Sequence, residues 1–164
     1  MNRDSTFGEL VHEFIGTAIL LLLGDGVVAN VVFGTRLGAA LGEQWLLINW
    51  GWGMAVAVAV YVAGGLTGAH INPAVSIGLA TAGLFPWIKV LPFILAQMMG
   101  AMAGAFTVWL FYRQHFNRTP DSAAQLGCFS TGPAIRKPGN NFFSEFIGTF
   151  VLIFVILYIA EPSM

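Results

Sequence analysis

The chain alternates between long apolar runs and short polar connections. Four apolar runs come close to the about 20 residues that a membrane-spanning helix needs. Each contains at most one charged residue, and they extend over Phe14–Gly34, Trp45–Leu66, Val90–Tyr112 and Phe142–Ile159. We therefore predict an all-α membrane protein with four transmembrane helices.

A fifth apolar run, Ala74–Gly83, is too short to cross a bilayer. Runs of about 10–14 residues are typical of re-entrant or buried segments. Asn is a favoured N-cap and Pro is well tolerated at the first helical position. The stretch "NPAVSIGLATAG" therefore predicts a short half-helix near residues 72–83 that begins at Asn72.

The segment before this half-helix, "GGLTGAHI", contains three glycines and lies in a run without charges. Non-helical backbone at membrane depth is tolerated only where protein buries it or where it lines a water-filled cavity. Its carbonyls are acceptors, the Asn72 amide is a donor, and the start of a helix is partially positive. This pattern suits a small hydroxylic molecule moving in single file, and it opposes cations and protons.

Composition supports the membrane assignment and excludes other classes. Of the 164 residues, 57% are hydrophobic and 9% are charged, against about 25% charged in soluble domains. Mean hydropathy is +0.76. A net charge of −1 offers no basic field for nucleic acid. The N-terminus does not resemble a signal peptide, and the single cysteine, Cys128, cannot form an intrachain disulfide.

No catalytic or metal-binding constellation is evident in the sequence. The three histidines, His12, His70 and His115, fall in separate settings, and no nucleophile–base pair accompanies them. We therefore expect no enzyme activity, no metal and no cofactor.

The sequence contains an internal repeat. "EFIGT" occurs at residues 13–17 and again at 145–149, within two apolar runs. If Ala74–Gly83 turns back without crossing, the two copies run in opposite directions through the membrane, as in many channels and transporters. If it crosses, they run parallel. We divide the chain into a first repeat with its connection, 1–139, and the first helix of a second repeat, 140–164.

Two further patterns concern packing. Gly100 and Gly104 form a GxxxG pattern, which predicts close helix–helix contact. The stretch Gln114–Gly139 is rich in turn formers and charges, and we interpret it as a solvent-exposed connection.

These motifs resemble the aquaporin and glycerol-facilitator family. "TGAHINPAV" is similar to the family's first signature, and the "EFIGT" repeat and Gln97 in "LAQMMGA" extend the resemblance over essentially the whole chain. The resemblance implies an inverted-repeat helix bundle with four transmembrane helices and one NPA half-helix present. It implies that the pore is lined by backbone or side chains of Gly68, Ala69, His70, Asn72, Pro73, Ala74 and Trp52.

The resemblance also distinguishes the glycerol branch of the family from the water-channel branch, and it assigns two residues to structural support of the half-helix loops. Trp52 matches a position that is Trp in glycerol facilitators and usually Phe in strict water channels, so the glycerol branch is favoured. Glu13 and Glu145 match buried carboxylates that accept hydrogen bonds from the half-helix loops. Carboxylates in membranes are costly, and we favour structural support over proton relay for both.

The chain departs from the family pattern in one respect. The family has six spans and a second NPA half-helix, which is followed by a filter arginine. The second NPA motif and the filter arginine are not present in these 164 residues. We interpret the chain as the N-terminal part of a glycerol facilitator, and the sequence does not say whether a truncated gene or a fragment is its origin. The family suggests a homotetramer in the full-length form.

The leading functional hypothesis is passive conduction of glycerol and small uncharged polyols, with some water. The alternatives are a water-selective aquaporin, an ion- or proton-coupled transporter that uses membrane carboxylates, and a truncated chain that conducts nothing.

The resemblance implies a multi-pass protein of the cell (plasma) membrane with a cytoplasmic N-terminus. That orientation leaves Arg3 and Lys89 inside, whereas five basic residues lie outside: Arg36, Arg113, Arg118, Arg136 and Lys137. The positive-inside rule prefers the reverse, so the two arguments disagree.

Overall fold

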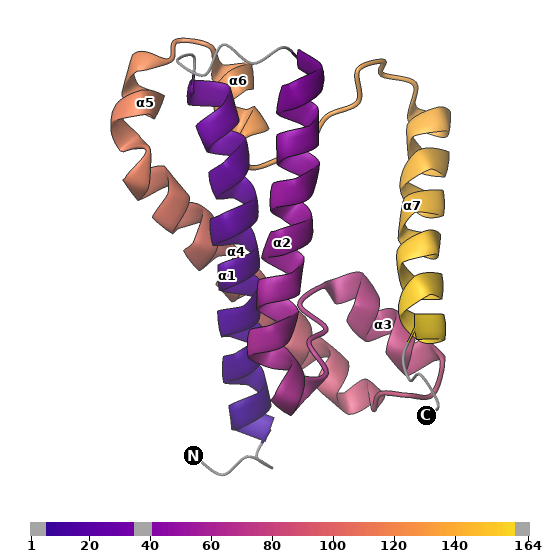
Figure 1. Cartoon of the computed structure of the whole chain (residues 1–164). Coiled ribbons are helices and arrows are strands. Elements are labelled where there is room, and N and C mark those ends of the chain that lie inside the picture. Colours follow the sequence, from indigo (N-terminus) through magenta and orange to yellow (C-terminus); the bar gives the residue numbers. More distant parts are fainter. Residues whose placement is uncertain (1–5, 35–40, 160–164) are drawn as a thin grey trace.

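The computed structural model describes residues 6–34 and 41–159, and the residues it describes are helical or irregular, without strands. Arg3 and Arg36, which entered the orientation argument, lie outside the described residues. The helices are α1 Thr6–Phe33, α2 Leu41–Thr67, α3 Pro73–Thr81, α4 Trp87–Phe111, α5 Arg113–Arg118, α6 Ser122–Gly127 and α7 Pro138–Ile159 (Figure 1).

Four of these helices are long and apolar enough to cross a membrane, namely α1, α2, α4 and α7. The prediction of four spans is confirmed, but the helices begin three to eight residues before the apolar runs. Polar turns extend each helix beyond its apolar part, because hydrogen bonding in a helix does not end where hydropathy falls. Near the start of α1 and α4, for example, Lys89 Nζ lies 2.7 Å from a Glu9 carboxylate oxygen.

Helix α1 packs against both α2 and α4. Two glycines of α4 permit the close approach: a Cβ on Gly100 would collide with the backbone carbonyl of Phe14, and one on Gly104 with that of Ala18. The GxxxG pattern therefore marks a close helix contact, as predicted. Such contact matters in lipid, where packing rather than the hydrophobic effect drives helix association.

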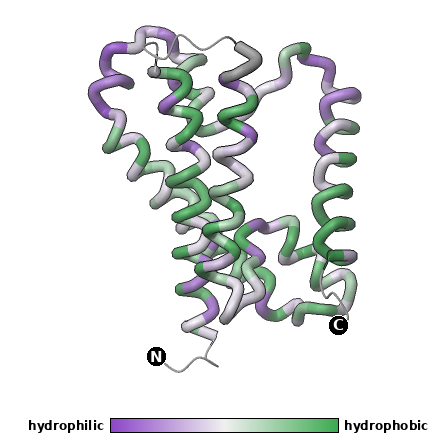
Figure 2. Tube along the Cα trace, in the orientation of Figure 1, coloured by the Kyte–Doolittle hydropathy of each residue, from purple (hydrophilic) through white to green (hydrophobic). Residues whose placement is uncertain are grey.

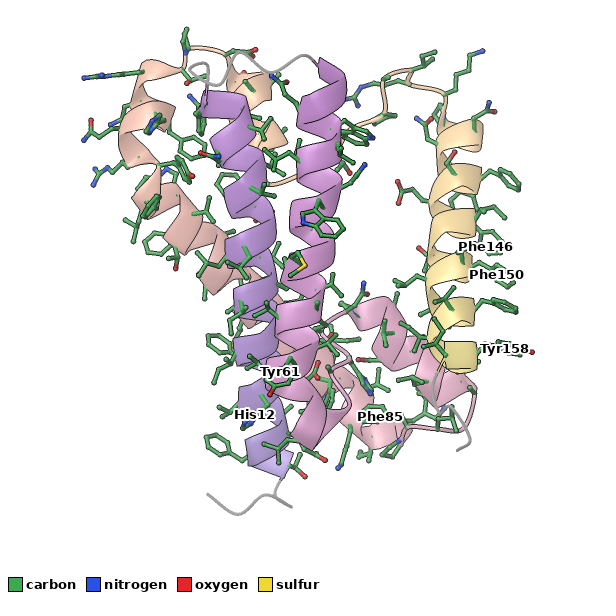
Figure 3. The ribbon with its side chains drawn as sticks, in the orientation of Figure 1. His12, Tyr61, Phe85, Phe146, Phe150 and Tyr158 are labelled. Carbon is green, nitrogen blue, oxygen red and sulfur yellow. The ribbon has the colours of Figure 1, made fainter. Side chains whose placement is uncertain are left out.

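Helix α7 stands apart from the other spans and meets the rest of the chain at α3 (Figure 1). The Ile153 side chain fills the space beside Gly78 of α3. No residue of α7 is buried, and hydrophobic residues cover most of its length (Figure 2). Phe146, Phe150 and Tyr158 project from its outer side, away from the other helices (Figure 3).

The connection after α4 was predicted to be exposed, and this prediction is wrong in part. It folds into α5 and α6, and Phe116 and Cys128 within it are buried. The Phe116 ring packs edge-on against Phe33 at the end of α1, with 4.7 Å between centroids. Gln125 Nε2 ties the two short helices together by donating to the Phe116 and Thr119 carbonyls. Aromatic residues spaced along a polar stretch produce this cover, which a count of turn formers does not detect.

Candidate functional site

The segment between α2 and α3 turns back within the membrane-spanning part of the chain. Helix α2 ends at Thr67, and α3 begins at Pro73. Gly68, Ala69 and Ile71 all have positive φ, at 76°, 51° and 41°. This conformation is ordinary for glycine but strained for Ala and for β-branched Ile, so the surrounding structure must impose it.

The Glu13 carboxylate of α1 holds this loop. Its Oε1 accepts hydrogen bonds from Thr67 Oγ1 (2.6 Å) and from the His70 backbone N–H (3.0 Å). Its Oε2 accepts from the Ile71 backbone N–H (2.8 Å) and from Gln97 Nε2 of α4 (2.7 Å). Glu13 is fully buried. Four donors compensate for burying the carboxylate, which would otherwise be very costly.

A second set of contacts fixes the His70 ring. Its Nδ1 lies 2.9 Å from Ser76 Oγ on α3, and Gln97 Nε2 also donates to Ser76 Oγ (3.0 Å). Phe85 and Phe93 flank the ring at centroid distances of 4.4 and 5.1 Å. The ring is therefore buried in a packed network, and the backbone carbonyl is the part of His70 left for a ligand.

Asn72 caps the half-helix as the sequence predicts. Its Oδ1 accepts from the Ala74 backbone N–H (2.8 Å), and Pro73 occupies the first helical position. The cap fixes which end of the Asn72 amide is used, so Nδ2 points away from the helix start. Among the described residues, Nδ2 donates to no acceptor.

Unpaired acceptors precede this unpaired donor. In the described part of the chain, no group donates to the backbone carbonyls of Gly68, Ala69 or His70. Asn72 is half-buried and Gly68 is exposed. The loop therefore presents three carbonyl acceptors, one amide donor and the positive start of α3 within the six residues 68–73.

Trp52 lies at a different level of the bundle. Its half-buried ring on α2 packs against Gly24 of α1, where an added Cβ would come within 2.5 Å of the ring. Gly24 is eleven residues beyond Glu13, which places it about 16 Å further along α1. The structure thus separates Trp52 from the Asn72 loop along the bundle axis.

Glu145 was predicted to be a buried carboxylate like Glu13, and its support of a half-helix loop stays a prediction. Its side chain is exposed on α7, and no described group hydrogen-bonds to it. Gly148, three residues after Glu145, has open space where a Cβ would be. A Cβ on the matching Gly16 would come within 2.9 Å of the Ala63 and Ile71 side chains. The re-entrant loop packs on the first "EFIGT" copy, and nothing described here packs on the second.

Sequence reasoning missed three side chains that complete the network, Thr67, Ser76 and the role of Gln97. Each is an uncharged polar residue in an otherwise apolar run, and this was the available signal. Which of them meet depends on the arrangement of α1, α2 and α4, which the pattern of one segment does not encode.

Comparisons of sequence and of structure with known proteins lead to the same family. The family profile described as Major intrinsic protein (MIP) matches residues 1–164. The chain is 52% identical over 152 residues to a probable glycerol uptake facilitator protein of Thermotoga maritima, covering 93% of this chain and 64% of that protein. It is 48% identical over 157 residues to glycerol uptake facilitator protein 3 of Lactiplantibacillus plantarum, covering 96% and 65%.

Among solved structures, the aquaglyceroporin from Plasmodium falciparum superposes with a TM-score of 0.65 at 37% sequence identity. The match covers 73% of this chain and 48% of that one. The chain spans less than two thirds of the length of the two bacterial relatives.

Proposed function

Because the chain belongs to the major intrinsic protein family, whose curated relatives include glycerol uptake facilitators, we propose that it conducts glycerol and small uncharged polyols passively, with some water. It is a multi-pass membrane protein, with four helices long and apolar enough to span. The proposal rests on one observation: the loop held by buried Glu13 presents three carbonyls and the Asn72 Nδ2 side by side, none of them bonded to another described residue.

The loop matches the chemistry of a polyol. Each hydroxyl both donates and accepts, so it donates to the carbonyls of Gly68, Ala69 or His70 and accepts from Asn72 Nδ2. A molecule with several hydroxyls exchanges one such pair for the next without losing hydrogen bonds. The positive start of α3 opposes cations at the same place.

The remaining assignments follow from the same proposal. Pro73 and Ala74 form the start of the half-helix beside the path. Trp52, supported by Gly24, provides an apolar face for the carbon chain at a separate level. We assign residues 1–139 to the first repeat and its connection, and 140–164 to the first helix of the second.

The proposal places the N-terminus in the cytoplasm, the protein in the plasma membrane and the full-length form in a homotetramer. The described basic residues favour the opposite orientation, since Lys89 lies at the end of the bundle near the N-terminus and Arg113 and Arg118 at the other. Protease accessibility of an N-terminal tag in sealed, oriented vesicles tests this, and digestion from outside overturns the cytoplasmic assignment.

Ion-coupled transport finds less support. Coupling requires ion-binding groups close together near the midplane, but the candidate carboxylates are dispersed. All the donors of the Glu13 carboxylate are protein groups. Asp25 is buried about 18 Å further along α1, and Glu145 is exposed on α7.

Stopped-flow light scattering on proteoliposomes containing this chain tests the proposal, with glycerol and water gradients applied separately. We expect glycerol flux faster than in empty liposomes and independent of proton or sodium gradients. Asn72→Asp replaces the donor Nδ2 with an acceptor and should abolish that flux. Asn140→Asp makes the same change at an exposed position and should leave it intact.

Flux equal to that of empty liposomes would refute conduction by this chain. Dependence on an ion gradient would favour the coupled transporter, and water flux without glycerol flux would favour a water-selective channel.

A further inference from the structure

A pocket with an apolar and a polar side lies at the end of the bundle opposite the N-terminus, between the end of α1 and the short helix α5. Its volume is about 390 Å³. Val32 and Phe33 of α1 form its apolar side, and Gln114, His115 and Arg118 of α5 form its polar side. It is separate from the Asn72 loop, which lies beside α3 near the other end of α1.

The polar side of the pocket consists of donors without partners among residues 6–34 and 41–159. In the part of the chain that the structure describes, no carboxylate pairs with Arg118, and no group hydrogen-bonds to the side chains of Gln114 or His115. Asp121, three residues after Arg118, instead caps α6 by accepting from the Ala123 backbone N–H (2.9 Å). A pocket that contains a cation and several donors, but no carboxylate of its own, is suited to bind an anionic ligand.

The exposed His115 ring lies beside two aromatic rings. Its centroid lies 5.9 Å from that of Phe33 and 5.5 Å from that of Tyr112. Phe116 anchors the same helix turn by packing against Phe33. Helix α5 is therefore packed against the end of α1, and the pocket lies between them.

The position of the pocket along the bundle indicates which kind of anion can reach it. Helix α5 begins two residues after the spanning helix α4 ends at Phe111. Trp109 and Tyr112 lie at this boundary, and Arg113 sits over the Trp109 ring at 5.4 Å. Aromatic residues followed by basic ones are typical of the membrane–water interface, where lipid headgroups lie.

We propose that this pocket binds the phosphate of an anionic phospholipid headgroup. The Arg118 guanidinium supplies the charge and a two-pronged donor that fits phosphate oxygens. Gln114 and His115 donate further hydrogen bonds, and Val32 and Phe33 contact the apolar part of the lipid. The apolar side next to the donors favours a lipid over a free phosphate ion, because a phosphate ion has no apolar part to place there.

Native mass spectrometry of the purified, delipidated chain in detergent tests the proposal. Dioleoylphosphatidylglycerol, dioleoylphosphatidylcholine and inorganic phosphate are added in separate titrations. We expect adducts with phosphatidylglycerol in preference to phosphatidylcholine. Arg118→Gln should weaken the phosphatidylglycerol adduct about tenfold, because it removes charge-assisted hydrogen bonds to the phosphate as well as the charge. Arg118→Lys, which keeps the charge but loses the planar fork, should fall in between.

Arg136→Gln is the matched control, because it removes the same charge from an exposed connection outside the pocket. Equal loss in R118Q and R136Q would overturn the site, since it would show only a general charge effect. Equal binding of phosphatidylglycerol and phosphatidylcholine would overturn the preference for an anionic headgroup. Displacement of the lipid by millimolar inorganic phosphate would show a free-anion site instead of a lipid site.

Discussion

Replacing Glu13 by glutamine tests how the re-entrant loop is held. The amide has the same shape as the carboxylate but offers one acceptor oxygen instead of two. If the amide nitrogen faces Thr67 and His70, the Thr67 hydroxyl can turn toward the Ala63 carbonyl, 3.2 Å away, but the His70 N–H loses its acceptor. If it faces Ile71 and Gln97, the Gln97 amide can flip, but the Ile71 N–H is left unpaired.

One buried backbone donor is therefore lost in either orientation, and the charge that strengthened the other bonds is lost as well. An unsatisfied buried donor together with weakened charge-assisted bonds costs about 3 kcal/mol. That corresponds to about a 100-fold increase in the opening equilibrium of the loop.

Hydrogen–deuterium exchange of the peptide covering residues 66–76 measures this opening directly. We expect the protection of the His70 and Ile71 amides to fall about 100-fold in Glu13→Gln. Glu145→Gln is the control, because Glu145 is exposed and accepts no bond from a described group. Unchanged protection in E13Q would refute the reasoning, since it would show that something other than the carboxylate holds the loop.

Two further predictions concern packing and thiol chemistry. Gly104→Ala places a Cβ against a backbone carbonyl of α1, and we expect a loss of about 1–3 kcal/mol in stability, seen as earlier thermal unfolding in detergent. Gly53→Ala, with open space around it, should show no such loss, and equal effects would contradict the close contact. Cys128 is 1% exposed, and burial raises the pKa of its thiol to about 11. Because the neutral thiol then predominates at pH 7.5, N-ethylmaleimide should label it slowly until SDS unfolds the chain, whereas the exposed Ser130→Cys variant of a Cys128→Ser background should label at once; fast labelling of native Cys128 would contradict its burial.

The half-helix could be predicted from sequence because its signals are local. Asn72 and Pro73 stand at the start of a short apolar run, and N-cap geometry depends on only a few neighbouring residues. The structure places Asn72 as the cap and Pro73 at the first helical position. The four spans were likewise predictable, since length and hydropathy determine them, whereas their ends depend on polar turns that carry no apolar signal.

The partners of Glu13 could not be predicted in the same way. Thr67 comes from α2 and Gln97 from α4, and their meeting with Glu13 of α1 depends on how those helices pack. Glu145 shows that a local motif alone does not determine burial. It carries the same local motif as Glu13, yet it is exposed, because burial is decided by what packs on the motif rather than by the motif itself.

The strained loop also has a consequence for the order in which the chain is assembled in a bilayer. Glu13 lies 57 and 58 positions before the two backbone donors it binds, and 84 positions before Gln97. The left-handed conformations of Ala69 and Ile71 have one local hydrogen bond, from the Ala69 N–H to Thr67 Oγ1, and otherwise depend on the Glu13 carboxylate. We therefore expect them to be stable only once α1 and α4 stand side by side. During synthesis we therefore expect the loop before the half-helix to settle after the third span has been inserted. A ribosome-bound chain ending before α4 should leave residues 68–76 open to solvent, although the segment itself is already complete.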